Sequence, residues 1–153
     1  MSLLRDLLGQ VGRTVTAYVG DKALMLAAVS AAANVIVADG EVAGPEFDAA
    51  LHGLSADPVL MKGYDALMLE TELYEGIARA RTRLGRAENL RNVTAIAERP
   101  DSQRENVFLI AADVADQDGI SNIEASALGE IAAALQVDGI GLLRASPVRR
   151  PPA

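Results

Sequence analysis

Residues 115–125 read ADQDGISNIEA and lie between two apolar segments. Residues 37–46, VADGEVAGPE, have the same arrangement in the other half of the chain. In each stretch an Asp-Gly pair, which is common in turns, follows an apolar segment and an acidic residue opens the next one. We interpret the two stretches as the turns of two related helix–turn–helix hairpins, an internal pseudo-repeat.

The composition agrees with helices on either side of these turns. The chain has 153 residues, of which 50% are hydrophobic and only 3% aromatic. Alanine and leucine, which favour helix, supply most of the apolar content. We therefore expect an all-α fold, a single bundle of about seven helices over residues 1–144, followed by a disordered tail at 145–153.

Apolar residues at helical spacing set the expected elements. Gly85 is expected to end a long fourth helix, on which Arg79 and Arg83 would share a face and Glu75 would pair with Arg79. The uncharged run 23–38 is shorter than the roughly 20 residues of a membrane span, so we expect a buried helix of a soluble protein. The helices are expected at about 3–15, 22–38, 45–55, 64–84, 88–98, from 101 or 102 to the second turn, and from 122.

Charge and residue usage disfavour several classes of function. The formal net charge of −7 opposes binding to nucleic acid, whose phosphates would be repelled. The absence of cysteine excludes disulfides, thiolate metal sites and cysteine nucleophiles. His52 is the only histidine, which excludes metal sites that need two, and it has no evident partner in the sequence. No phosphate-binding loop or nucleophile motif is present, so we expect a protein that is not an enzyme.

The carboxylates at the two turns are the candidate site. Like charges held close together are unfavourable unless a cation such as Ca²⁺ or Mg²⁺, or a basic partner surface, offsets them. The alternative is that they cap helices, because acidic residues in a first turn interact well with the helix dipole. The candidates are Asp39, Glu41 and Glu46 at the first turn, and Asp113, Asp116, Asp118 and Glu124 at the second.

Neither turn fits the calcium loop of an EF-hand. With Gly40 as the turn glycine, the first and third ligand positions would be Val35 and Val37, whose side chains cannot bind a cation. With Gly119 in that role, the first and last positions would be Val114 and Ala125. A cation at either turn would need another geometry.

The pairing of AAANVIVADGEVAGPE with LIAADVADQDGISNIEASALGEIAAAL resembles the TerB family of tellurite-resistance proteins. The resemblance covers about residues 1–138, and GEIAAAL at 129–135 resembles the usual ending of the family, with Gly129 in place of an arginine. The second turn is one residue shorter than the first, since its acidic residue comes six rather than seven positions after the aspartate.

The resemblance implies an all-helical, non-enzymatic, cytoplasmic stress-response protein. It implies partners among TerC-like integral membrane proteins and calcium-binding TerD-like proteins, with peripheral association to the inner membrane through them. It implies metal or partner sites at the matching positions Asp39, Glu46, Asp116, Asp118 and Glu124. A different class of function stays open, namely a structural or assembly module, such as a phage or complex subunit, whose carboxylates only cap helices.

Overall fold

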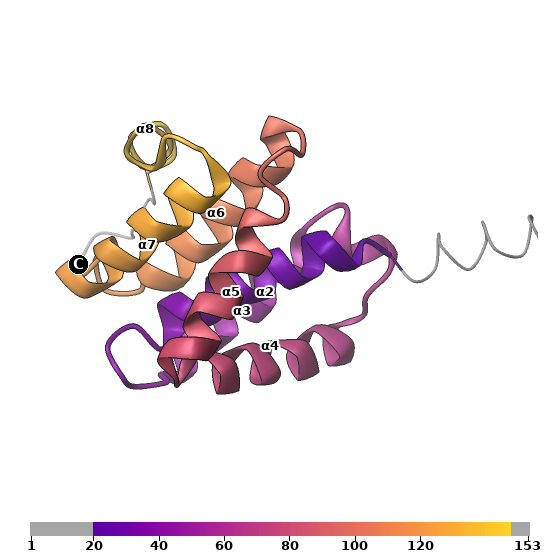
Figure 1. Cartoon of the computed structure of the whole chain (residues 1–153), viewed down its shortest axis with the longest axis horizontal. Coiled ribbons are helices and arrows are strands. Elements are labelled where there is room, and N and C mark those ends of the chain that lie inside the picture. Colours follow the sequence, from indigo (N-terminus) through magenta and orange to yellow (C-terminus); the bar gives the residue numbers. More distant parts are fainter. Residues whose placement is uncertain (1–19, 148–153) are drawn as a thin grey trace, which may run out of the picture.

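The computed structural model describes residues 20–147, and within them the chain is helical with no strands (Figure 1). The all-α bundle of about seven helices is thereby confirmed. The expected helix at 3–15 and residues 148–153 of the expected tail lie outside the described residues. The elements are α2 (Lys22–Ile36), α3 (Gly44–Ala56), the 3₁₀ turn η1 (Leu60–Lys62), α4 (Ala66–Ala80), α5 (Arg83–Thr94), α6 (Asp101–Ala115), α7 (Asn122–Leu135) and α8 (Gly139–Ala145).

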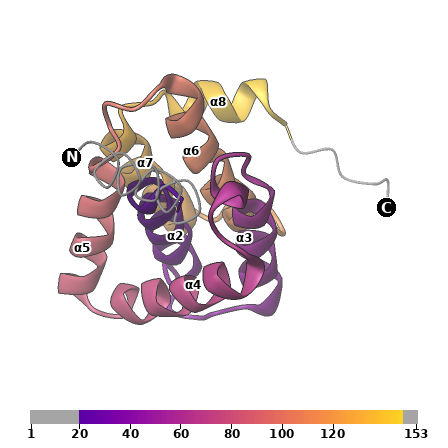
Figure 2. The same cartoon turned by 90° about the vertical axis from the view of Figure 1, so that its right-hand side faces the viewer.

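Helix α2 lies at the centre of the bundle, and Figure 2 shows α3, α4, α5, α6 and α7 around it. Its sequence, KALMLAAVSAAANVI, is apolar on nearly every face, which is the pattern of a buried helix. Nearly every residue from Leu24 onward is buried. The many alanines let neighbouring helices approach closely, so that larger side chains such as Phe108 and Leu135 fill the space between them.

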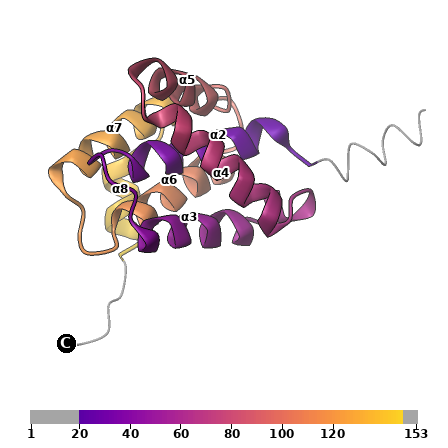
Figure 3. The same ribbon diagram turned by 90° about the horizontal axis from the view of Figure 1, so that it is seen from below.

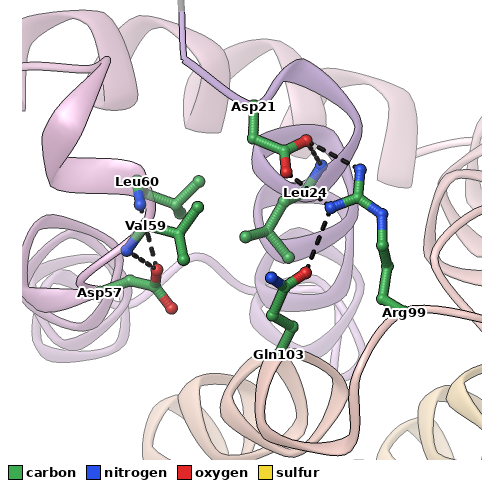
Figure 4. A network of polar contacts seen from close by, with 7 residues as sticks. All are labelled: Asp21, Leu24, Asp57, Val59, Leu60, Arg99 and Gln103. Carbon is green, nitrogen blue, oxygen red and sulfur yellow. Dashed lines mark hydrogen bonds and ion pairs between the residues drawn. The ribbon is translucent and has the colours of Figure 1, made fainter. Parts of the chain in front are cut away.

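The amino end of α2 is fixed by an ion pair. Asp21 accepts a hydrogen bond from the backbone N–H of Leu24 and therefore caps the helix. The same carboxylate accepts two hydrogen bonds from the guanidinium of Arg99, at 2.6 and 3.0 Å, and Arg99 also donates to Gln103 (Figure 4). The hydrogen bonds from Arg99 lower the pKa of Asp21. A separate carboxylate in Figure 4, that of Asp57, accepts hydrogen bonds from the backbone N–H groups of Val59 and Leu60, where η1 begins.

The two hairpins of the sequence analysis are α2–α3 and α6–α7. Gly40 and Gly119 have φ angles of 86° and 91°, a left-handed conformation that glycine adopts without steric cost. Figures 1 and 3 show the two turns at the same end of the bundle. The packing of α6 against both α2 and α3 holds the hairpins together. The expected turns are therefore confirmed.

The expected helix at 64–84 is wrong, because the chain bends at Arg81 and Thr82. Thr82 caps a new helix by accepting a hydrogen bond from the backbone N–H of Gly85 at 3.0 Å. A Cβ on Gly85 would lie 1.9 Å from the carbonyl oxygen of Arg79, so glycine permits the bend instead of ending a helix. Arg79 and Arg83 consequently belong to different helices.

Helix α8 was missed by the sequence analysis, because Gly139 and Gly141 are poor helix formers. Asp138 caps it by accepting a hydrogen bond from the backbone N–H of Gly141 at 3.0 Å. A Cβ on Gly139 would come within 2.9 Å of the Phe108 ring, so this glycine allows α8 to pack closely on α6. Helix α8 ends at Ala145.

No single helix within residues 20–147 is both long and apolar enough to cross a membrane. The pair α7 and α8 reaches the required length and composition together, but the two helices meet at 110°.

Candidate functional site at the acidic turns

Glu46 lies in the first turn of α3, behind Pro45, and is half-buried. Its Oε2 atom is shielded from solvent and has no hydrogen-bond partner among the described residues. An ionised carboxylate without partners is costly to bury. Desolvation, followed by the charges of Asp39 and Glu124, raises the pKa of Glu46 to about 7.

The electrostatic effect of Glu124 on Glu46 links the two hairpins. Glu124 belongs to α7 and Glu46 to α3, and their turns lie at the same end of the bundle (Figure 3). Asp39, from the first turn, acts on the same carboxyl group. Three of the predicted site residues, one from the second turn and two from the first, are thus close enough to influence one another.

Glu124 is buried and has a structural role. Its Oε1 atom accepts a hydrogen bond from the backbone N–H of Ser121 at 3.1 Å, and the Ser121 hydroxyl accepts one from the backbone N–H of Glu124 at 3.2 Å. These reciprocal bonds form a capping box at the start of α7. The capping interpretation is therefore confirmed for Glu124, which also contributes negative charge to this end of the bundle.

The exposed carboxylates of this surface are Asp39, Glu41 and Asp118. Asp39 accepts a hydrogen bond from the backbone N–H of Glu41 at 3.0 Å, which stabilises the first turn locally. Asp118 precedes Gly119 at the apex of the second turn. These three carboxylates face solvent while Glu46 and Glu124 lie deeper.

Asp113 and Asp116 form a second group. Asp113 is exposed, yet desolvation of its carboxyl group, followed by the charge of Asp116, raises its pKa, while His52 on α3 opposes that rise. His52 therefore has an electrostatic partner that the sequence did not reveal. Asp113 and Asp116 line a cavity of about 140 Å³ together with Leu143, Ser146 and Pro147. The seven predicted site residues thus fall into two groups, Asp113 with Asp116 and the carboxylates around Glu46, with Asp118 exposed at the apex of the second turn.

No group of three or more histidine or acidic side chains in residues 20–147 is arranged so that it could hold a metal ion. The cavity beside Asp113 and Asp116 offers two carboxylates. Ca²⁺ takes six to eight oxygen ligands, so a cation at either group would need water or a partner to complete its coordination.

The predicted pairing of Arg79 with Glu75 is replaced by a buried polar network. Arg79 Nε donates to Asn89 Oδ1 at 2.8 Å, and Asn89 Nδ2 donates to Asn34 Oδ1 at 2.9 Å and to the carbonyl of Gly76 at 3.1 Å. Asn34 in turn donates to the carbonyl of Arg86. Asn34 could have predicted this network from the sequence. It lies in the otherwise apolar sequence of α2, and a buried side-chain amide needs hydrogen-bond partners.

Comparison of the chain with known protein families, with curated proteins and with solved structures gives no match.

Proposed function

We propose that this chain is a non-enzymatic, cytoplasmic, TerB-like stress-response protein that binds a partner protein through one acidic surface. The surface comprises Asp39, Glu41 and Glu46 of the first hairpin with Asp118 and Glu124 of the second. The observation that carries the proposal is the Oε2 atom of Glu46, which is shielded from solvent and has no hydrogen-bond partner among the described residues. Asp39 and Glu124, one from each hairpin, add negative charge beside it and help to raise its pKa.

A basic partner would gain most at such a surface. The exposed carboxylates already repel one another and the chain carries a net charge of −7, so neutralisation by lysine or arginine relieves an existing repulsion. The half-buried carboxyl of Glu46 would then ionise, because a nearby positive charge favours its charged form. Binding by this route releases a proton near neutral pH.

The resemblance to the TerB family points to TerD-like calcium-binding proteins and TerC-like membrane proteins as partners. A Ca²⁺ or Mg²⁺ ion shared between this surface and such a partner would obtain the oxygen ligands that the chain alone lacks. Association with the inner membrane would follow from a TerC-like partner rather than from a span in this chain.

Calorimetric titration with a purified TerD-like protein, with and without Ca²⁺, tests the proposal. The double variant Asp39→Asn, Asp118→Asn is expected to weaken binding about tenfold or more, since two charges leave the interface. The matched control Glu88→Gln, Glu98→Gln removes the same charge from exposed positions in and after α5 and is expected to bind normally. If both variants weaken binding equally, the effect comes from the net charge of the protein and not from this surface, which would contradict the proposal. Undiminished binding of the Asp39→Asn, Asp118→Asn variant would also contradict it.

The capping box at Ser121 and Glu124 favours the second candidate, a structural or assembly module. In that case the carboxylates stabilise helices, and contacts with other subunits lie elsewhere. Analytical ultracentrifugation of the wild type and of the Asp39→Asn, Asp118→Asn variant distinguishes the two. The module predicts an assembly that the substitutions leave intact.

A further inference from the structure

The bend between α4 and α5 is the most basic part of the described chain. Residues 76–87, GIARARTRLGRA, contain four arginines and no acidic residue, although the formal net charge of the chain is −7. Arg81 and Arg83 are exposed and Arg86 is half-buried. None of these three takes part in an ion pair among residues 20–147. We call Arg81, Arg83, Leu84 and Arg86 the basic corner.

The basic corner lies beside the first acidic turn. The side-chain amide of Asn34, near the end of α2, donates a hydrogen bond to the backbone carbonyl of Arg86 at 3.2 Å. Asp39 follows Asn34 by five residues, which span at most about 18 Å. Figures 1 and 3 show the α4–α5 bend at the end of the bundle that carries the two acidic turns. One end of the molecule therefore carries a negative surface and a positive surface next to each other.

Both surfaces also expose apolar side chains. Leu84, between the arginines of the basic corner, is 76% exposed. Val42 in the first turn and Ile123 at the start of α7 are 38 and 56% exposed. Protein interfaces combine an apolar centre with a polar rim. Each surface thus offers charges together with an apolar side chain that a partner could cover.

The acidic surface next to the basic corner narrows the choice of partner. A nucleic acid or an anionic membrane would be attracted by the arginines and repelled by the neighbouring carboxylates. A second copy of the chain brings both surfaces in the same arrangement. When two copies face each other across a twofold axis, the acidic surface of each can meet the basic corner of the other, and every contact is made twice. Charge complementarity therefore favours a second copy.

We propose that the chain forms a twofold dimer in which the basic corner of each copy binds the acidic surface of the other. Leu84 of one copy then lies against the exposed apolar side chains of the other, Val42 and Ile123. The inference rests on the proposed function in one respect, the use of the acidic surface as a binding face. A partner protein would need the same carboxylates, so dimerisation and partner binding exclude each other.

Sedimentation equilibrium tests the dimer. The wild type is expected to dimerise at low salt, with a dissociation constant that rises about tenfold or more at an ionic strength of about 1 M, where screening is nearly complete. Arg81→Glu, Arg83→Glu is expected to be monomeric, because the reversed corner repels the acidic surface. The control Lys22→Glu, Lys62→Glu makes the same change in net charge at the opposite end of the bundle and is expected to dimerise normally.

Three outcomes of this experiment would overturn the proposal. They are a wild type that is monomeric at low salt, a dimer that salt does not weaken, and equal loss of dimer in the control and in Arg81→Glu, Arg83→Glu.

Mixing two variants separates a broken interface from a damaged fold. Glu41→Lys, Asp118→Lys reverses the acidic surface and is expected to be monomeric alone. When it is mixed with Arg81→Glu, Arg83→Glu, each reversed surface meets one of opposite charge, so a one-to-one dimer is expected. A mixture that stays monomeric would overturn the proposal.

Calorimetry with the TerD-like protein distinguishes this inference from the proposed function. Arg81→Glu, Arg83→Glu keeps the acidic surface and is expected to bind that protein at least as tightly as the wild type, in which a second copy competes. If this variant binds the TerD-like protein but is still dimeric, the dimer proposed here is wrong and the proposed function stands. If the dimer forms as predicted and the TerD-like protein does not bind, the dimer stands without the proposed function.

Discussion

Glu46 is the residue at which the electrostatics of the two hairpins meet. Burial removes water from one of its oxygens, and two other carboxylates act on the same group. Both effects favour the protonated form, so the folded protein retains a proton that the unfolded chain loses near pH 4.5. The interaction is a local cost at neutral pH that the rest of the fold offsets.

This cost predicts how stability depends on pH. The pKa of Glu46 is higher in the folded than in the unfolded state, so its contribution to stability is full below about pH 4.5 and is lost as the pH rises toward 7. Glu46→Gln should remove this dependence and be about 1 kcal/mol more stable than the wild type at pH 7.5, a value discounted for partial exposure. Urea unfolding at pH 5 and pH 7.5 measures it.

Asp113 provides the internal comparison for that experiment. Its pKa is also raised, so it adds a contribution of the same sign to the wild type and to the Glu46→Gln variant alike. The difference between the two proteins therefore isolates Glu46. A variant that tracks the wild type at both pH values would contradict the assignment.

At the scale of elements, glycines have opposite effects in α5 and α7. Gly85 lies against the carbonyl of Arg79, whereas a Cβ on Gly129 would meet nothing within 4 Å. Gly85→Ala is expected to cost about 3 kcal/mol through overpacking, while Gly129→Ala should stabilise by about 0.5–1 kcal/mol through reduced freedom of the unfolded chain. Thermal unfolding of the two variants compares them, and a tolerated Gly85→Ala would mean that the bend between α4 and α5 is not tight.

The asparagine network fixes α2, α4 and α5 relative to one another. Asn89 is fully buried and bonds to both Asn34 and Arg79, so Asn89→Ala leaves several buried polar groups unpaired and should cost about 2–4 kcal/mol. Asn92, half-buried on the same helix, donates one bond to Ser30 and provides the control, with an expected cost of about 1 kcal/mol for Asn92→Ala. Chemical denaturation ranks the two, and equal costs would contradict a special role for the network.

At the scale of the whole molecule, the bundle brings together two turns that are far apart in the sequence. A divalent cation is a simple probe of such a surface. An amide-resolved NMR titration with Ca²⁺ and then Mg²⁺ should shift residues 39–46 and 118–124 together, with an affinity on the order of 10⁻³ M typical of incomplete oxygen coordination. Asp39→Asn with Asp118→Asn should abolish the shifts at both turns. If the amide shifts of the wild type do not change with either cation, the isolated protein binds no cation at this surface, and only protein partners are left as its ligands.

The sequence predicted the hairpins well because their signals are local. Gly40 and Gly119 adopt the left-handed conformation that an Asp-Gly turn suggests, and the alanine-rich run at 23–38 forms the central helix. The bend after α4 escaped prediction because it depends on the contact of Gly85 with a carbonyl six residues away. The ion pair of Asp21 with Arg99 and the network of Asn89 escaped for the same reason, since each joins residues that only the fold brings together.

The candidate site was predicted in its residues but not in its arrangement. First-turn acids are recognisable in the sequence, and the capping role of Glu124 was one of the two alternatives. The separation of Asp113 and Asp116 from Glu46 and Glu124 depends on how α6 packs against α3 and α8, which spacing along the chain does not encode.

If the two turns act as one acidic surface, the pKa of Glu46 reports it directly. ¹³C NMR of the side-chain carboxyl groups should be followed through pH in the wild type and in Glu124→Gln, which keeps an acceptor for the capping box but removes the charge. We predict a pKa of about 7 for Glu46 in the wild type and a lower value in the variant. An unchanged pKa of Glu46 in Glu124→Gln would show that the hairpins are electrostatically separate and would contradict the proposed surface.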